Sequence, residues 1–341
     1  MHESLEHGEE AVIVTIEARC DTITVIPMRC FESKKMTKTS SIISNLRSLV
    51  ARRSSGVEVE WDVLLAELVA VEITEFHEIV LPYLESSRRF LPDSLGRVDS
   101  ASDLEAVAAR IPFARLVLDL GGDDDPIEEL ARAVSSPGAS NLVGLDIGCC
   151  DLGDKGVGTL ADHIDAVPLE YLYCGANNIS SDGVLELLSG DKIADLRELH
   201  LPSNDIGVLG TSALLDSGLS SLELLDLSDN RIDVELESYT RGGRGRARFS
   251  SKRLELANNR IHDADVIRFI EGDDYPVLEY LGLAGNGIDD RPALSLLEGD
   301  VFPALRTLDL SRNRISSRTA NRLMELAWGR GITLDVTMQY D

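Results

Sequence analysis

The sequence predicts an α/β fold: a right-handed repeat solenoid that bends into an arc, with parallel strands inside and helices outside, after a small α+β domain. Three observations predict it. One phrase, Leu-x-x-Leu-x-Leu-x-x-Asn-x-Ile, recurs over roughly the last two-thirds of the 341 residues. Its central leucine returns at a nearly constant interval. Most copies are followed by a segment with the hydrophobic spacing of a helix.

Six copies follow the phrase closely, and a seventh at Leu142–Leu152 follows it loosely. The central leucines are Leu118, Leu145, Leu172, Leu199, Leu225, Leu254, Leu281, Leu308 and Leu334. Successive members are 26 to 29 residues apart, which indicates a repeat array. Within each unit the Leu-x-Leu alternation predicts a short strand with one buried face.

An asparagine follows each predicted strand at the point where the chain must turn. A buried amide there can satisfy backbone groups of its own turn and of the neighbouring turn. We therefore predict a structural role for Asn177, Asn204, Asn230, Asn259, Asn286 and Asn313.

The second half of most units is predicted to form an outer helix. Segments at Gly183–Leu188, Ala293–Leu297 and Thr319–Ala327 have this pattern. Asp263 and Ser316 stand where helix-capping side chains are expected, before segments that end near Phe269 and Trp328.

The phrase, its period and the helical second halves resemble the leucine-rich repeat family, and they are most similar to its ribonuclease-inhibitor-type branch. The resemblance implies a curved, protein-binding array. The sequence predicts three parts: a small α+β domain at 1–86, a linker and capping helix at 87–111, and the repeat array at 112–341. The array would hold about eight units of about 27 residues and a terminal strand.

Residues between the buried leucines are expected to point into the arc. At the central inward position six of nine residues are carboxylates, and neighbouring strands lie about 4.8 Å apart. Such stacking destabilises the free protein unless something basic relieves it. The expected partner-binding residues are Asp146, Tyr171, Tyr173, His200, Asp226, Glu255, Tyr280 and Asp309. The alternative is that aspartate is a common filler after a strand leucine.

One tract in the longest unit is basic and rich in glycine. Its arginines are Arg241, Arg244, Arg246 and Arg248. Glycine at this density opposes a helix, so we expect a loop. The acidic body can neutralise it, although Arg/Gly tracts also bind RNA or acidic partners.

The first part of the chain has no repeat. Strand patterns at Val12–Ile16 and Thr22–Ile26 precede a helix pattern at Ser40–Val50, a strand pattern at Val57–Trp61 and a second helix pattern after Ile73. This order, over about residues 11–85, resembles the BTB/POZ fold and its ubiquitin-ligase adaptor relatives. An unrelated small α+β cap is the alternative.

Composition excludes several classes of function. The net charge of −26 disfavours broad nucleic-acid binding. Five cysteines argue against a disulfide framework, and packing explains Cys150 and Cys174 inside the repeats. We expect no metal and no cofactor. The chain has no apolar run of membrane-spanning length, and its acidic start is unlike a signal peptide. An intracellular place, cytoplasm or nucleus, is expected.

No phosphate-binding glycine loop, zinc-peptidase motif or nucleophile elbow is present, so we predict that the chain is not an enzyme. The predicted function is a protein–protein interaction scaffold whose acidic concave face holds a partner with a basic surface. The N-terminal resemblance implies a substrate receptor or adaptor in a ubiquitin-ligase-type complex. The alternative is a GTPase activator, because Ran GTPase-activating proteins share this type of repeat. That family has an acidic C-terminal run, whereas Ile332–Asp341 contains only two acids.

Overall fold

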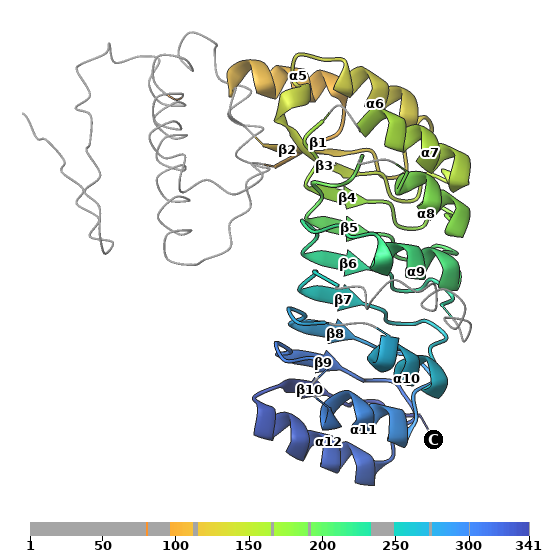
Figure 1. Cartoon of the computed structure of the whole chain (residues 1–341). Coiled ribbons are helices and arrows are strands. Elements are labelled where there is room, and N and C mark those ends of the chain that lie inside the picture. Colours follow the sequence, from red (N-terminus) through yellow and green to blue (C-terminus); the bar gives the residue numbers. More distant parts are fainter. Residues whose placement is uncertain are drawn as a thin grey trace, which may run out of the picture.

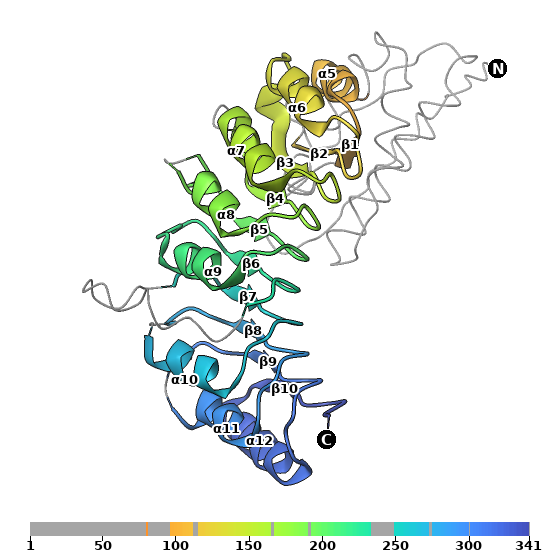
Figure 2. The same cartoon turned by 90° about the vertical axis from the view of Figure 1, so that its right-hand side faces the viewer.

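The computed structural model describes Val80 and residues 96–111, 115–164, 167–189, 192–232, 249–272, 275–299 and 301–340. These residues form a ten-stranded parallel sheet whose strands follow the order of the chain, with helices along one side of it (Figures 1 and 2). The predicted α/β repeat solenoid is therefore confirmed. Except for Val80, the α+β domain expected at 1–86 lies outside the described residues, as does the Arg/Gly tract.

The strands are short and regularly spaced. They are β1 (Gly96–Val98), β2 (Leu116–Asp119), β3 (Leu142–Asp146), β4 (Tyr171–Tyr173), β5 (Glu198–His200), β6 (Leu224–Asp226), β7 (Arg253–Glu255), β8 (Tyr280–Gly282), β9 (Thr307–Asp309) and β10 (Thr333–Asp335). The central leucines pair in register from Leu118 to Leu334. From Leu118 to Leu308 each is fully buried, which stabilises the array by about 1.5–3 kcal/mol per side chain.

The outer layer contains eight described α-helices. They are α5 (Ala101–Arg110), α6 (Pro126–Val134), α7 (Gly153–Ile164), α8 (Ser181–Leu187), α9 (Gly207–Asp216), α10 (Asp263–Gly272), α11 (Asp290–Glu298) and α12 (Ser317–Arg330). Ser316 caps α12 as predicted, accepting a hydrogen bond from the Thr319 amide at 3.3 Å. The capping role predicted for Asp263 is wrong. Asp263 is the first residue of α10, and its carboxylate accepts from the Asp289 amide of the next unit.

Carboxylates at helix starts join neighbouring units. Asp290, the first residue of α11, accepts hydrogen bonds from the amide and the hydroxyl of Ser316, both at 2.7 Å. Asp154 in the first turn of α7 makes the same pair of bonds to Ser180, also at 2.7 Å. A negative charge is favourable at a helix N-terminus. Part of the acidic composition therefore serves the stacking of helices.

Buried asparagine amides connect the turns that follow the strands. The Asn259 carbonyl accepts from the amides of Asn230 and Ile232, and its NH₂ donates to the carbonyls of Leu227 and Leu256. Each of the others also accepts from at least one backbone amide and donates to at least two backbone carbonyls: Asn177, Asn204, Asn230, Asn286 and Asn313. We call this set the asparagine ladder.

Different residues occupy the two ends of the ladder. The Cys150 thiol donates to the carbonyls of Leu120 and Gly148, both at 3.2 Å, in the place of an asparagine NH₂. Gln339 closes the other end, accepting from the Ile315 amide at 3.0 Å and donating to the Leu310 carbonyl at 2.9 Å. The role of Gln339 was not predicted, because the residues after Leu334 depart from the repeat phrase and have no asparagine.

The sheet begins earlier than the repeat phrase indicates. Strand β1 lies in the stretch where the sequence predicted only a linker and a helix, and it pairs in parallel with β2. Val98 and the fully buried Val80 belong to the same hydrophobic core as the repeat leucines. The core therefore extends to the N-terminal side of residue 112.

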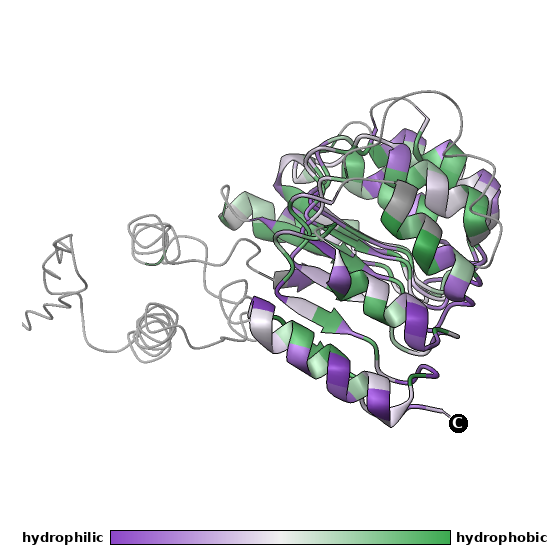
Figure 3. Cartoon of the chain, turned by 60° about the horizontal axis from the view of Figure 1, so that its bottom comes forward, coloured by the Kyte–Doolittle hydropathy of each residue, from purple (hydrophilic) through white to green (hydrophobic). Residues whose placement is uncertain are grey.

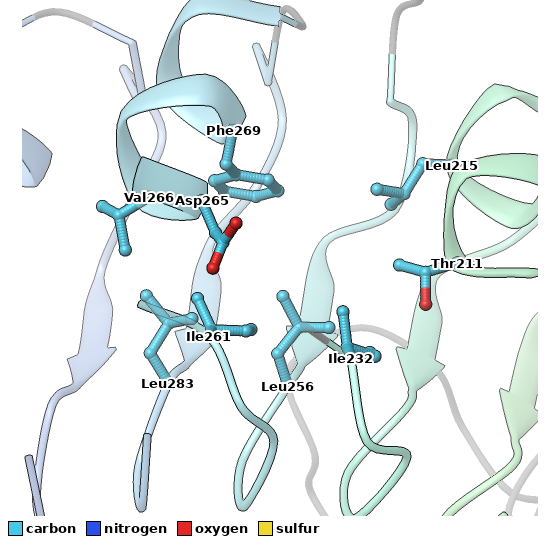
Figure 4. A pocket seen from close by; sticks show the side chains of 9 residues that line it. All are labelled: Thr211, Leu215, Ile232, Leu256, Ile261, Asp265, Val266, Phe269 and Leu283. Carbon is cyan, nitrogen blue, oxygen red and sulfur yellow. The ribbon is translucent and has the colours of Figure 1, made fainter. Parts of the chain in front are cut away.

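A small cavity of about 20 Å³ lies in the core between α9 and α10 (Figure 4). Its walls are Thr211, Leu215, Ile232, Leu256, Ile261, Asp265, Val266, Phe269 and Leu283. Ile232 is the last described residue before the gap at 233–248. A space of this size holds about one water molecule.

We predict that Asn313→Ala lowers the free energy of unfolding by about 1–3 kcal/mol, because it leaves buried backbone groups unpaired. Chemical denaturation followed by circular dichroism measures the change. Asn321→Ala is the matched control: Asn321 is exposed on α12, where alanine is a better helix former. Equal stability of the two variants would contradict a structural role for the ladder.

Candidate functional site

The sheet face opposite the helices carries two rows of side chains, and we call it the inner face. Parallel register aligns the central row: Asp119, Asp146, Tyr173, His200, Asp226, Glu255, Gly282, Asp309 and Asp335. The second row lies two residues earlier on each strand: Arg97, Val117, Gly144, Tyr171, Glu198, Leu224, Arg253, Tyr280, Thr307 and Thr333. All eight expected partner-binding residues belong to these rows.

The carboxylates of the central row have a local structural task. One oxygen of Asp309 accepts from the Ser311 amide, and one of Asp335 from the Thr337 amide, both at 2.9 Å. The same bond, to the amide two residues on, is made by Asp119, Asp146, Asp226 and Glu255. It pairs an amide at the turn that follows the strand. The strand end thus favours an acidic or amide residue here, and the second oxygen remains available for other contacts.

Arg97 relieves the charge at the N-terminal end of the row. Its Nη1 atom lies 2.8 Å from Asp119 and 2.8 Å from Asp146, on neighbouring strands. The arginine comes from β1, which the sequence analysis did not predict. The chain itself therefore shows how a guanidinium fits between two carboxylates of the central row.

Two tyrosines of the inner face lie against glycines: Gly144 in β3, and Gly148 and Gly175 in the turns after β3 and β4. A Cβ atom placed on Gly148 would come within 2.6 Å of the Tyr173 ring, and one on Gly175 within 2.5 Å of its hydroxyl. Tyr171 covers Gly144 in the same manner, with ring carbon Cδ1 at 3.2 Å from such a Cβ. The glycines therefore make room for an aromatic surface. Burial, together with the nearby Asp146, raises the pKa of Tyr171 to about 12, so its hydroxyl keeps its proton.

His200 joins this aromatic surface to the acidic row. Its ring centroid lies 5.4 Å from that of Tyr171 and 6.1 Å from that of Tyr173. Its nitrogens lie 3.4 Å from Glu198 and 3.6 Å from Asp226. Burial alone would lower the pKa of His200, but the two carboxylates outweigh it and raise the pKa to about 9. The imidazole is therefore a cation at neutral pH.

A second group forms on β7 and β8. The Tyr280 hydroxyl donates to Glu255 at 2.8 Å, and the Arg253 guanidinium lies 4.1 Å from the centre of the Tyr280 ring. Burial raises the pKa of Glu255 although the bond from Tyr280 acts in the opposite direction. A Cβ on Gly282 would lie 2.1 Å from a Glu255 oxygen, so Glu255 covers that glycine.

The expected residues therefore fall into two groups, and the acidic Asp309 belongs to neither. Asp146, Tyr171, Tyr173, His200 and Asp226 form one group, and Glu255 and Tyr280 form the other. Asp309 pairs in register with Asp335 on β10. Neither makes an ion pair within the described part of the chain.

A further charged row, which was not predicted from the sequence, lies immediately before strands β4 to β9. Signs alternate from strand to strand in the row Glu170, Arg197, Glu223, Lys252, Glu279 and Arg306. Arg197 lies 2.5 Å from Glu223, and Lys252 lies 2.8 Å from the same residue. The residue after the first position of each phrase alternates in sign, so the pattern was readable. Exposed pairs add little stability, but the alternation favours the observed neighbours.

The remaining expectations concern the Arg/Gly tract, metal binding, the cysteines and membrane-spanning segments. The Arg/Gly tract with Arg241, Arg244, Arg246 and Arg248 lies outside the described residues. Among described residues, no group of three or more His, Cys, Asp or Glu side chains could hold a metal ion. Cys149, Cys150 and Cys174 are free thiols, and burial raises the pKa of Cys150. In the described part of the chain, no helix is long and apolar enough to span a membrane.

We predict that His200 titrates with a midpoint near 9 in the folded protein and that Asp226→Asn lowers this midpoint. A raised folded-state pKa stabilises the fold fully below about 6.5 and loses this effect as the pH rises through about 9. The stability difference between wild type and His200→Gln should therefore be largest at pH 6 and shrink above pH 9. NMR titration and denaturation at each pH measure both effects. A midpoint near 6.5 in the wild type would contradict the assigned contacts.

Two segments match family models described as Leucine Rich Repeat, at residues 304–326 and at residues 138–161. No curated protein matches the chain. Among solved structures, the chain is similar to a Bacteroides fragilis protein whose crystal structure was a structural-genomics target. The two share 16% identity over 90% of this chain and 86% of that one, with a TM-score of 0.42. The family-model matches and the ten-stranded parallel sheet together show that this chain carries a leucine-rich repeat solenoid.

Proposed function

We propose that the chain is a non-catalytic scaffold that holds a protein partner with a basic surface on its inner face. Leucine-rich repeats support protein–protein interaction in general. The observation that carries the proposal for this chain is the central row itself: one oxygen of each carboxylate serves the turn, which leaves a second oxygen for other contacts. At Asp309 and Asp335 the second oxygen has no cation beside it within the described residues.

The N-terminal end of the same row supports a basic partner. There Arg97 supplies the positive charge beside Asp119 and Asp146. His200 supplies it beside Asp226. Both contacts relieve the like-charge repulsion that stacking produces. Within the described part of the chain, Glu255, Asp309 and Asp335 on β7 to β10 make no ion pair, so a partner's arginine or lysine would complete them.

The aromatic surface gives the proposed site an anchor. The Tyr171 and Tyr173 side chains pack closely against glycines, so little side-chain freedom would be lost on binding. Aromatic side chains are common hot spots in protein interfaces. A partner with basic side chains around an apolar centre matches this arrangement.

Two more specific roles follow from resemblances to known families. A substrate receptor or adaptor in a ubiquitin-ligase-type complex follows from the resemblance of residues 11–85, which the structure does not describe apart from Val80. A GTPase activator similar to the Ran GTPase activator is the alternative. On the described inner face the arginines are Arg97, clamped by two carboxylates, and Arg253, stacked on Tyr280. A GTP-turnover assay with small GTPases distinguishes the two roles, because a scaffold leaves the rate of hydrolysis unchanged.

We predict that the triple variant Glu255→Gln, Asp309→Asn and Asp335→Asn weakens partner binding about 10- to 100-fold. The amides keep the bond to the turn, so the fold is retained while three charges, each worth about 0.5–1 kcal/mol, are removed. Partners are captured from the native cell on the full chain and their affinities are then measured in purified form.

The matched control neutralises three exposed acids on outer helices, Glu105, Glu186 and Glu298, as glutamines. It removes the same charge from the helix side and should bind like the wild type. An equal loss in the control would mean that net charge, and not the inner face, holds the partner. Capture with and without residues 1–95 shows which partners need the N-terminal part.

A further inference from the structure

The end of the stack formed by α12 and β10 carries a surface that differs from the acidic inner face. Seven large hydrophobic side chains are exposed among the described residues, and four of them lie between residues 324 and 340. These four are Met324, Trp328, Met338 and Tyr340. Trp328 is 88% exposed, the highest value of the seven.

Helical spacing places the exposed side chains of α12 in two stripes. Thr319, Leu323 and Ala327 are buried against the array. Met324 and Trp328 are four residues apart and share one side of the outer face. Arg318 and Arg322, also four apart, share the other side. Figure 3 shows α12 lying across the end of the stack beside β10.

Helix α12 is basic, with three arginines and one acid, Glu325, whereas the chain as a whole has a net charge of −26. Residues 310–341 contain five arginines and three acids, Glu325, Asp335 and Asp341. Glu325 lies 2.9 Å from Arg322, so its charge is compensated locally. Arg330 donates to the carbonyls of Leu297, Gly299 and Phe302 and thus holds α12 on α11. The other three arginines make no ion pair within the described part of the chain: Arg312, Arg314 and Arg318.

We propose that the outer face of α12 is a docking surface for an acidic segment of a protein partner, one that also carries apolar side chains. Tryptophan, methionine and arginine are the residue types enriched in protein interfaces, and the two stripes consist of these three. Arg318 and Arg322 on α12, with Glu325 as the single acid of the helix, favour an acidic occupant by charge complementarity. A second copy packed with its α12 antiparallel across a two-fold axis would bring arginines against arginines. The surface is separate from the inner face, which presents the opposite charge.

The chain has two tryptophans, so Trp61→Phe makes Trp328 the single fluorescent reporter. The probe is an 18-residue helical peptide with leucine on one face and glutamate on the other. The matched peptide has lysine in place of every glutamate. With the full-length protein, the glutamate peptide should shift the Trp328 emission to shorter wavelength and protect it from acrylamide. The lysine peptide should do neither, and added salt should weaken the response.

Two variants locate the contact, and peptide anisotropy measures their affinity. Met324→Ser with Trp328→Ser, and separately Arg318→Gln with Arg322→Gln, should each weaken binding of the glutamate peptide at least about tenfold. These side chains are exposed, so circular dichroism should show an unchanged fold. Leu185→Ser with Leu209→Ser is the matched control on α8 and α9, whose leucines are 53% and 46% exposed, and it should bind normally.

Three results would overturn the proposal. They are equal binding of the lysine peptide, no loss in either α12 variant, and a Trp328 shift that depends on protein concentration alone. The last result would assign the face to a second copy of the chain. The triple variant of the inner face should bind the glutamate peptide at least as well as wild type, so this test and that of the proposed function fail separately.

Discussion

The asparagine ladder is the constraint on which the rest of the structure depends. Each coil closes because one amide pairs backbone groups of two successive turns, as Asn259 does between the units on either side of it. The ladder fixes how far each strand is displaced from the one before. Parallel register follows, and with it the alignment of the leucines inside and of the charged residues outside. Without that fixed step the inner face would have no rows.

This dependence explains why the inner face could be predicted in such detail from the sequence. Once the phrase sets the register, the position after each central leucine must lie in one row, and Asp119 to Asp335 do so. The contacts within the row could not be predicted in the same way. Arg97 belongs to a strand without the phrase, and the placement of Tyr173 depends on glycines from two neighbouring units. Local pattern carries no information about such pairings. Asp263 illustrates the same limit, because its partner lies in the next unit.

The carboxylates of the inner face reconcile two interpretations of the acidic composition. Aspartate after a strand leucine does have a structural reason, the bond to the amide two residues on. That bond occupies one oxygen and leaves the other for a second contact. In Asp119 and Asp146 the second oxygen binds a guanidinium. A residue retained for the turn is therefore also a ready acceptor, and structural use and partner recognition are compatible in the same side chain.

The cavity between α9 and α10 has a consequence for how the array comes apart. Units in a linear stack are held only by their neighbours, so cooperativity is transmitted through each junction in turn. Wall atoms that face this space have fewer dispersion contacts on that side, so packing at this junction contributes less than a fully filled core would. We expect partial opening of the array, as measured by amide exchange, to begin near β6 and β7, whose units contribute Ile232 and Leu256 to the walls of this space.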